Sequence, residues 1–386
     1  MILIFWTSVI GILFIYAGYP VVLFLLSKIK GKTETQSYAG SILPEVAIVI
    51  AAYNEEDIIK AKIENTMALD YPGEKLKIYV VADGSNDATA AIALQYDGVT
   101  VLHQYERKGK SAAINRVMKF VKEPITVFTD ANVMINTDAL LALVKQYNNS
   151  KTGAVSGEKV VMHDDRAAAA STEGAYWKYE SYVKRKDAEL STIVGAAGEL
   201  FSVRTALFEE IAEDTLLDDF MISMSIVRKG YSVKYEPKAL ASEKPSFNIE
   251  EEYKRKVRIA AGGIQSIQRN LDFCNPLRHG LVSFQFLIHR VSRWTVAPVF
   301  IVAAFVANLF LIGQSSTYTA IFFLQVIFHL AALTGYYFST RQVKVKLLHI
   351  PFYFDFMHYC VVMSWFRYSR GKQKAVWQKA TRLSYN

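Results

Sequence analysis

The stretch that decides the fold is an apolar run with a polar tip: Thr126-Val127-Phe128-Thr129-Asp130-Ala131-Asn132. β-Branched and aromatic residues favour a strand, and this one ends abruptly in an acid and an amide. The carboxyl ends of strands in an open α/β sheet face the ligand crevice, so Asp130 and Asn132 are expected to face a pocket. Their oxygens suit one hard divalent cation, Mg²⁺ or Mn²⁺. The alternative is a plain helix N-cap or Asx turn, which favours the same residue types.

The composition places part of the chain in a membrane. Of its 386 residues, 52% are hydrophobic, and neither residues 2–27 nor residues 295–340 contain a charged side chain. About 20 apolar residues cross a bilayer, so the first run predicts one crossing and the second predicts two, at about 295–312 and 318–340. The polar segment between the two runs has the size of an enzyme domain.

The net charge of +8 comes from cations beside the apolar runs rather than from a nucleic-acid-binding stripe. This positive-inside pattern places the polar domain in the cytoplasm, at a bacterial plasma membrane, with no nucleic acid as partner. The first run lacks a basic leader and a small-residue cleavage pattern, which favours an uncleaved anchor over a signal peptide. Cys274 and Cys360 are far apart, give no metal-binding spacing and are expected to stay reduced.

Strand and helix patterns alternate through the first half of the polar segment. This alternation predicts an α/β fold with right-handed crossovers and a mostly parallel sheet. The first strand shows no alternation of apolar and polar residues, which indicates burial on both faces. The expected strands cover residues 46–52, 77–82, 99–103, 125–129 and 153–161. One expected helix opens at residues 53–57 and runs toward Met67, and two others cover residues 88–95 and 110–121.

Three of these strands end in acids, at residues 55–57, at Asp83 and at Asp130. Parallel strands bring such ends to one edge of the sheet. An acidic edge repels phosphate unless a cation intervenes, and Lys110 begins a helix nearby. A nucleoside diphosphate with a metal ion satisfies both charges. The alternatives are a plain Asp-Gly-Ser turn at residues 83–85 and a solvated lysine at position 110.

The second half of the polar segment is expected to bind the acceptor. An aromatic helix over residues 173–186 suits sugar rings, although a core stripe is the commoner explanation. Residues 216–220 start a helix that ends near residues 228–231. The alternative role of Asp218 and Asp219, at its start, is to complement the helix dipole. Residues 250–262 form a basic helix, whose alternative role is to lie on anionic lipid.

Taken in order, these motifs resemble the family-two inverting glycosyltransferases with a GT-A fold, whose membrane-embedded branch includes cellulose, chitin and hyaluronan synthases. The resemblance rests on residues 51–55, 83–85, 108–110 with Asn115, 129–132, 193–204 and 218–231. It implies a nucleotide sugar donor, with UDP as the expected nucleotide, and a general base that takes the acceptor hydroxyl's proton. By this resemblance Asp219 is the base, and the metal pair is Asp130 with Asn132, where the family has a second acid. The nucleotide-binding set is Ala52, Tyr53, Glu55, Asp83, Lys110, Asp130, Arg255 and Arg258, and the acceptor set is Gly195, Gly198, Glu199 and Asp218.

The chain departs from the processive synthases at their Q-x-x-R-W motif. Arg255 replaces the Gln, Ile259 replaces the Trp, and only Arg258 is kept. Transfer of one sugar to a lipid-linked glycan is therefore the favoured expectation. A processive polysaccharide synthase that also secretes its polymer is the first alternative, and a non-catalytic sugar-nucleotide-binding partner of another synthase is the second.

Residues 347–366 contain Asp355 and His358, so we expect a re-entrant or interfacial segment rather than a crossing. The expected layout of the whole chain has six parts. The parts are an anchor at 1–27, a linker at 28–43, the catalytic domain at 44–248, basic and interfacial helices at 249–294, a membrane region at 295–366 and a basic cytoplasmic tail at 367–386.

Overall fold

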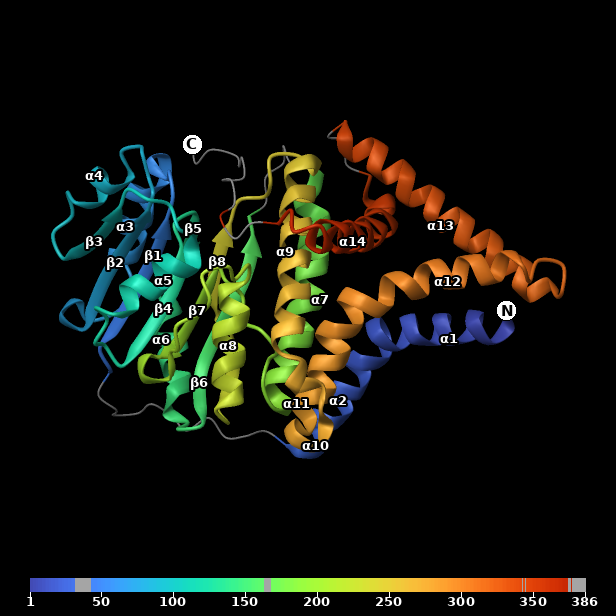
Figure 1. The fold of residues 1–386 in the computed structure, drawn as a ribbon, viewed down its shortest axis with the longest axis horizontal. Coiled ribbons are helices and arrows are strands. Elements are labelled where there is room, and N and C mark those ends of the chain that lie inside the picture. Colours follow the sequence, from blue (N-terminus) through green and yellow to red (C-terminus); the bar gives the residue numbers. More distant parts are fainter. Residues whose placement is uncertain (32–42, 163–167, 342, 344, 374–375, 377–386) are drawn as a thin grey trace. The chain divides into compact units, whose positions relative to one another are not determined.

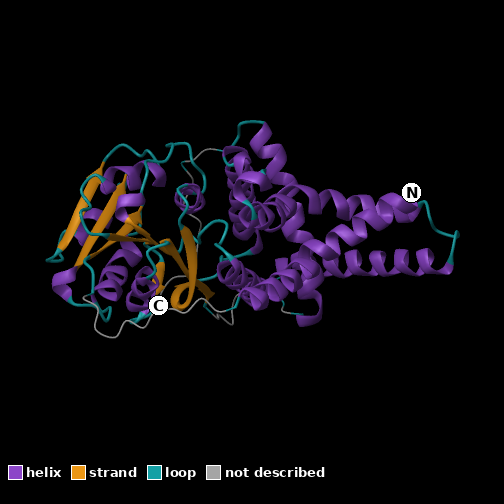
Figure 2. Ribbon diagram, turned by 90° about the horizontal axis from the view of Figure 1, so that it is seen from below, coloured by secondary structure: helices purple, strands orange, loops and turns teal. Residues whose placement is uncertain are grey.

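The computed structural model describes residues 1–31, 43–162, 168–341, 343, 345–373 and 376 (Figure 1). Most of the expected linker at 28–43 and of the expected tail at 367–386 lies outside these residues. The chain forms two compact units. A helical unit comprises residues 1–29, 163–176 and 245–373, and a sheet unit comprises residues 30–162, 177–244 and 374–386. All strands of the described chain belong to the sheet unit, as Figure 2 makes visible.

Eight strands form one sheet in the order β3-β2-β1-β4-β7-β6-β8-β5. The pairs β1 with β2, β1 with β4, β2 with β3 and β6 with β8 are parallel, whereas β7 is antiparallel to both neighbours and β5 to β8. The mostly parallel α/β sheet predicted from the sequence is confirmed. The strands are β1 (Val46–Ala52), β2 (Leu76–Asp83), β3 (Val99–Gln104), β4 (Ile125–Asp130), β5 (Val133–Ile135), β6 (Thr152–Val161), β7 (Leu200–Arg204) and β8 (Ser232–Glu243).

The register brings the three acidic strand ends to one edge. Ala52 of β1 pairs with Ala82 of β2, and Ala51 of β1 pairs with Asp130 of β4. The strands β2, β1 and β4 are neighbours and parallel, so their carboxyl ends lie in a row. The sheet unit thus brings the ends of three strands that are distant in sequence to a single edge.

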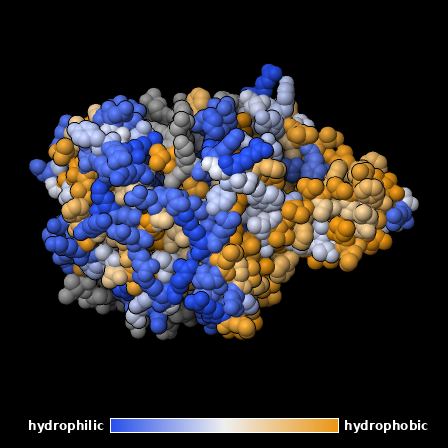
Figure 3. Space-filling model, in the orientation of Figure 1, coloured by the Kyte–Doolittle hydropathy of each residue, from blue (hydrophilic) through white to orange (hydrophobic). Residues whose placement is uncertain are grey.

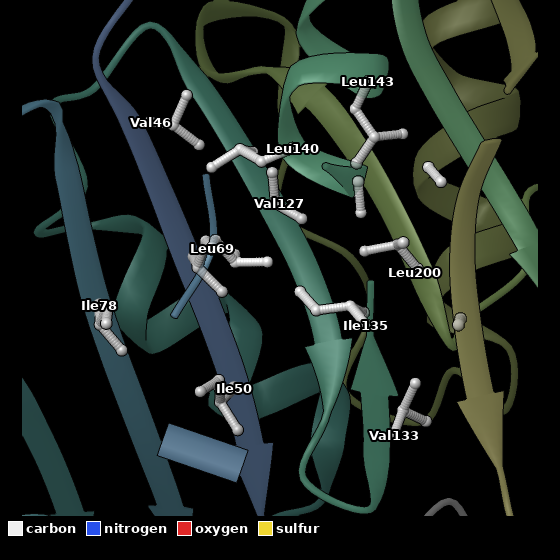
Figure 4. Packing of buried hydrophobic residues seen from close by; sticks show 14 of the residues in the cluster. Val46, Ile50, Leu69, Ile78, Val127, Val133, Ile135, Leu140, Leu143 and Leu200 are labelled. Atoms are coloured by element: carbon white, nitrogen blue, oxygen red, sulfur yellow. The ribbon is translucent and has the colours of Figure 1, made fainter. Parts of the chain in front are cut away.

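The core lies on both faces of the central strands. Val46, Ile48 and Ile50 of β1 point to one face of the sheet and Ala47 and Val49 to the other. All five are buried, which confirms the prediction made from the unalternating pattern of this strand. Val127 and Leu200 pack in the same cluster (Figure 4). Full burial of each such side chain contributes about 1.5–3 kcal/mol. The sheet unit also holds α3 (Glu56–Met67), α4 (Thr89–Ala93), α5 (Lys110–Met118), α6 (Ala139–Lys145), α8 (Asp218–Arg228) and the C-terminal part of α7 (Ala168–Leu190).

The helical unit contains three helices that are long and apolar enough to cross a membrane: Ile2–Lys30, Leu281–Leu309 and Ser316–Thr340. Figure 3 shows apolar residues gathered over α1, α12 and α13, where Leu3 is 79% exposed and Leu333 is 64% exposed. Apolar side chains in such numbers face lipid rather than water. The helical segments here are α1 (Ile2–Leu13), η1 (Phe14–Gly18), α2 (Tyr19–Lys30), α11 (Leu281–Gln285), η6 (Phe286–Val296), α12 (Ala297–Leu309) and α13 (Ser316–Thr340).

The second of these helices starts earlier than the sequence predicts. Residues 287–294, expected to be a separate interfacial helix, continue directly into α12. The reason is that His289 and Arg293 are buried within the helical unit, so their polarity does not end the apolar surface. Another helix, α14 (Lys346–Ser369), follows α13, and His329 Nδ1 lies 2.7 Å from Asp355 Oδ2 between them. An interfacial position for α14 stays a prediction.

Candidate active site

The end of β1 forms the first wall of the site. Asn54 has a positive φ of 52°, which turns the chain sharply between Tyr53 and Glu55. The guanidinium of Arg107 lies 3.4 Å from the Tyr53 ring centroid. Across from it, a Cβ at Gly84 would lie 2.4 Å from Arg107 Cβ, so only glycine fits this approach. Ala52 is buried at the strand end, and Glu55 precedes α3, with its N–H donating to Thr89 Oγ1 at 2.8 Å.

Asp83 fixes the loop that leads into α5. Its Oδ2 accepts hydrogen bonds from the backbone N–H of Gly109 at 2.6 Å and of Lys108 at 3.1 Å. Arg116 Nη1 lies 3.7 Å from Oδ1. Hydrogen bonds from backbone N–H to a carboxylate are strong, so Asp83 holds Lys110 at the sheet edge. The expected contact of Asp83 with the nucleoside stays a prediction.

Lys110 brings together two predicted parts of the site. Its Nζ lies 2.8 Å from Asp130 Oδ1 and 3.3 Å from Asp218 Oδ2. Although burial favours the neutral amine, the carboxylates of Asp130 and Asp218 raise the pKa of Lys110 above its ordinary value. The protonated Lys110 therefore lies between Asp130, at the end of β4, and Asp218, at the start of α8.

Asp219, the base predicted from the sequence, has a raised pKa. Burial and then the neighbouring carboxylate of Asp218 raise the pKa of Asp219 to about 7, with Lys110 acting in the opposite direction. A base works best when its pKa lies near the working pH. A Cβ at Gly198 would lie 3.1 Å from Asp219 Oδ2, so the glycine leaves the carboxylate accessible.

The predicted acceptor loop is held from below. Gly195 has φ 93°, and a Cβ there would lie 2.3 Å from the Phe220 ring. The N–H groups of Ala196 and Ala197 donate to Ser223 Oγ and Ser156 Oγ, both at 3.1 Å. These hydrogen bonds hold the loop against α8 and β6.

Two buried lysines beneath this edge were missed by the sequence reasoning. Lys62 Nζ donates to Thr129 Oγ1 at 3.1 Å and to the Val133 carbonyl at 2.5 Å, and Thr129 Oγ1 donates to the Glu199 carbonyl at 3.0 Å. Burial lowers the pKa of Lys62 to about 7, with Asp130 opposing. In the sequence, the signal for a buried lysine was the position of Lys62 close to Ile59 and Ile63 on the same helix.

The second missed lysine is Lys159 on β6. Its Nζ lies 2.5 Å from Glu199 Oε1 and 3.1 Å from Glu243 Oε1, and 4.8 Å from the Trp177 ring centroid. Burial opposes ionisation of Glu199, but the Lys159 ammonium lowers the pKa of Glu199 below its ordinary value. Glu199 therefore remains charged, and Lys159 fixes it beside the acceptor loop.

Oxygen donors at the tip of β4 suit a hard divalent ion. Asp130 ends β4 and the half-buried Asn132 follows it in a turn, while the buried Asp218 Oδ2 at the start of α8 lies 3.3 Å from Lys110 Nζ. The residues that the structure describes contain no group of three or more His, Cys, Asp or Glu side chains arranged to hold a metal. The donor set fits Mg²⁺ or Mn²⁺ whose remaining ligands are water and phosphate oxygens.

Two further predicted residues, Arg255 and Arg258, belong to the helical unit. Arg255 and Arg258 lie on α9 (Ile249–Arg269). Arg255 is buried, and its Nη2 lies 3.0 Å from Glu252 Oε2. The structure therefore gives Arg255 an ion pair within its own helix, and binding of the diphosphate by Arg255 and Arg258 stays a prediction.

The sheet edge thus combines acids at the strand ends, a lysine between Asp130 and Asp218, and a carboxylate with a raised pKa, which is the kind of site expected of a GT-A glycosyltransferase. Comparison with known proteins agrees: residues 47–212 match the family model of glycosyl transferase family 2, so the chain carries a family 2 glycosyltransferase domain. Together with its apolar helices, this makes it a membrane glycosyltransferase.

Relatives and a solved structure extend this similarity beyond the matched domain. Poly-beta-1,6-N-acetyl-D-glucosamine synthase of Staphylococcus epidermidis is 23% identical over 326 residues, which cover 82% of this chain and 76% of the relative. The synthase of the same name from Staphylococcus aureus strain MSSA476 is 26% identical over 248 residues, covering 61% and 58%. The mannosyltransferase PcManGT from Pyrobaculum calidifontis, solved in complex with GDP-Man and Mn²⁺, has a TM-score of 0.71 at 19% identity, covers 95% of this chain and 99% of its own, and shares the fold.

Proposed function

We propose that this enzyme transfers a sugar, with inversion, from a UDP-sugar to the end of a growing polysaccharide at the cytoplasmic face of a bacterial plasma membrane. The observation that carries the proposal is the placement of Lys110, 2.8 Å from Asp130 and 3.3 Å from Asp218, beside Asp219. Cation, strand-tip acid and base are thus gathered where the chain's small-residue loop leaves room for an acceptor.

The reaction follows from the roles of these side chains. Asp219 takes the proton of the acceptor hydroxyl while the hydroxyl oxygen forms a bond to the anomeric carbon of the donor. The bond from that carbon to the phosphate oxygen breaks, and its electron pair leaves with the nucleoside diphosphate on the opposite face of the sugar. Lys110 stabilises the negative charge on the departing diphosphate.

A divalent ion fits this arrangement. Asp130 and Asn132 would hold Mg²⁺ or Mn²⁺, and the ion would neutralise part of the diphosphate's charge. The nucleoside is assigned to the wall made by Ala52, Tyr53, Glu55 and Asp83. Arginines 255 and 258 are proposed as additional diphosphate ligands.

Two candidate acceptors remain, a growing polysaccharide and a lipid-linked glycan. The named activity of the staphylococcal relatives supports polymer synthesis, and an N-acetylglucosamine polymer is our first candidate. Single transfer to a lipid-linked glycan is the second, since Ile259 stands where the processive synthases carry tryptophan.

The deciding experiment incubates the purified full chain in detergent with UDP-N-acetylglucosamine, UDP-glucose or UDP-galactose, followed by sizing of the product. A ladder of long polymer from UDP-N-acetylglucosamine supports the first candidate. A uniform mass increase of one sugar on a polyprenyl-linked acceptor supports the second. If no UDP is released from any of the three donors, with or without the polyprenyl-linked acceptor, the proposed donor class is wrong.

A further inference from the structure

A pocket with a basic rim lies between α9 and the C-terminal end of α14, both in the helical unit. Its volume is about 410 Å³. The apolar and aromatic part of its lining comes from Tyr253 and Val257 of α9 and from Met363 and Phe366 of α14. Three cations, Arg367, Arg370 and Lys372, complete the lining. None of these seven residues has been given a role above.

The rim keeps its positive charge. All three cations are exposed, and within the described ranges no carboxylate pairs with any of them. The acids at the start of α9 are already paired, because Lys254 Nζ lies 3.2 Å from Glu250 and 2.9 Å from Glu251.

The buried acid of α9 is paired as well. Glu252 lies 3.0 Å from Arg255 and 3.2 Å from Lys256. Every acid in the first turn of α9 thus has a cation of its own helix, and the three rim cations have no acid left on α9 to neutralise them. A pocket lined by three cations and by apolar and aromatic side chains matches a ligand that is anionic at one end and apolar at the other.

A membrane supplies such a ligand. Juxtamembrane basic residues attract anionic lipids at about 1 kcal/mol per Lys or Arg near the surface. Phe366 is 53% exposed beside the rim, as expected of an aromatic side chain at the headgroup level. We propose that this pocket binds the headgroup of an anionic phospholipid, with Arg367, Arg370 and Lys372 on its phosphate and Met363 and Phe366 against its glycerol and upper acyl chains.

Occupancy has a structural consequence. The lipid would touch both α9 and α14, and binding to the folded state alone raises its stability. The proposed ligand therefore fastens α14 to the helix that carries Arg255 and Arg258. The inference rests on the helical unit alone and does not depend on the donor or acceptor proposed above.

The test uses the purified full chain in neutral detergent. Native mass spectrometry measures binding of phosphatidylglycerol, phosphatidylcholine and glycerol 3-phosphate, and thermal unfolding is followed in parallel. The test variant is Arg367→Gln/Arg370→Gln/Lys372→Gln. The matched control is Arg278→Gln/Arg341→Gln/Lys346→Gln, which also removes three exposed cations of the same unit, all outside the pocket.

We expect wild type and control to bind phosphatidylglycerol at least tenfold more tightly than the triple variant, and to unfold at higher temperature when it is present. Because the substituted side chains are exposed, the variant should unfold like wild type without lipid. Phe366→Ser should weaken phosphatidylglycerol binding at an unchanged rim. Equal phosphatidylglycerol binding by the triple variant, equal binding of phosphatidylcholine, or competition by glycerol 3-phosphate at equal concentration would each overturn the proposal, the last by showing a site for free phosphate.

Discussion

Gly198 and Asp219 approach each other so closely that a Cβ on the glycine would lie 3.1 Å from the aspartate Oδ2. Gly198→Ala should therefore displace the carboxylate by a few tenths of an ångström. We expect kcat to fall about tenfold, which corresponds to about 1.4 kcal/mol of transition-state stabilisation, with unchanged affinity for UDP. Steady-state kinetics and UDP titration measure the two quantities. Gly73→Ala is the control, because no atom lies within 4 Å of its Cβ position. Equal rates for both variants would remove the argument for this contact.

Asp219→Asn should abolish transfer while the protein still binds UDP. Loss of a general base costs about 10²- to 10⁴-fold in rate, whereas the amide keeps the size and position of the side chain. Single-turnover transfer and UDP binding by calorimetry separate the two effects. Asp214→Asn, at an exposed acid of the preceding segment, should behave as wild type. A variant at position 219 that turns over at near wild-type rate would contradict the assignment of the base.

The pH profile should report the same carboxylate. Because burial and Asp218 raise the pKa of Asp219 to about 7, the active, deprotonated base is scarce below that pH and abundant above it. We expect kcat/KM to rise with pH and to reach half its plateau near pH 7. Asp219→Glu, if active, should shift the midpoint. A profile that stays flat through neutral pH would argue that the base titrates elsewhere.

Asn132→Asp should strengthen metal binding. A second carboxylate beside Asp130 adds negative charge to an oxygen donor set, and ligand charge tunes the affinity for hard cations. We expect the Mn²⁺ concentration for half-maximal activity to fall several-fold, and Asp130→Asn to raise it. Activity after chelation and readdition of metal provides the measurement. Asp97→Asn, at an exposed acid distant in sequence, is the control. An unchanged metal requirement in both position-130 and position-132 variants would place the ion elsewhere.

Lys62→Met should destabilise the sheet unit. The substitution leaves the Val133 carbonyl and the Thr129 hydroxyl without their buried donor, and a buried polar group left without a partner costs about 1–3 kcal/mol. Scanning fluorimetry should show a lower unfolding temperature than for Lys60→Met, an exposed lysine on the same helix. Since Thr129 precedes Asp130, the metal requirement should rise as well, an effect that general instability would not produce. Identical melting of the two variants would show that Lys62 is dispensable.

The sequence alone determined the kind of sheet and the polar ends of its strands. An unalternating apolar run such as residues 46–52 is stable only when covered on both faces, and a strand that stops at Asp130 presents that acid at the sheet edge. Local pattern also sufficed for a helix that begins within residues 216–220, observed as α8. It sufficed for the apolar helices as well, because lipid demands a continuous run of apolar side chains.

Only the tertiary structure decided which distant groups meet. No local pattern tells that Lys110 lies between Asp130 and Asp218, that Gly198 faces Asp219, or that Lys62 and Lys159 are buried beneath the edge. Sequence pattern predicts a lysine on a helix or a strand to be solvated. Its burial is tolerable only where the fold brings oxygen acceptors from other segments of the chain. The same reason explains why residues 287–294 join the second apolar helix: His289 and Arg293 have partners inside the helical unit, and such partners come from the folded chain rather than from their neighbours in sequence.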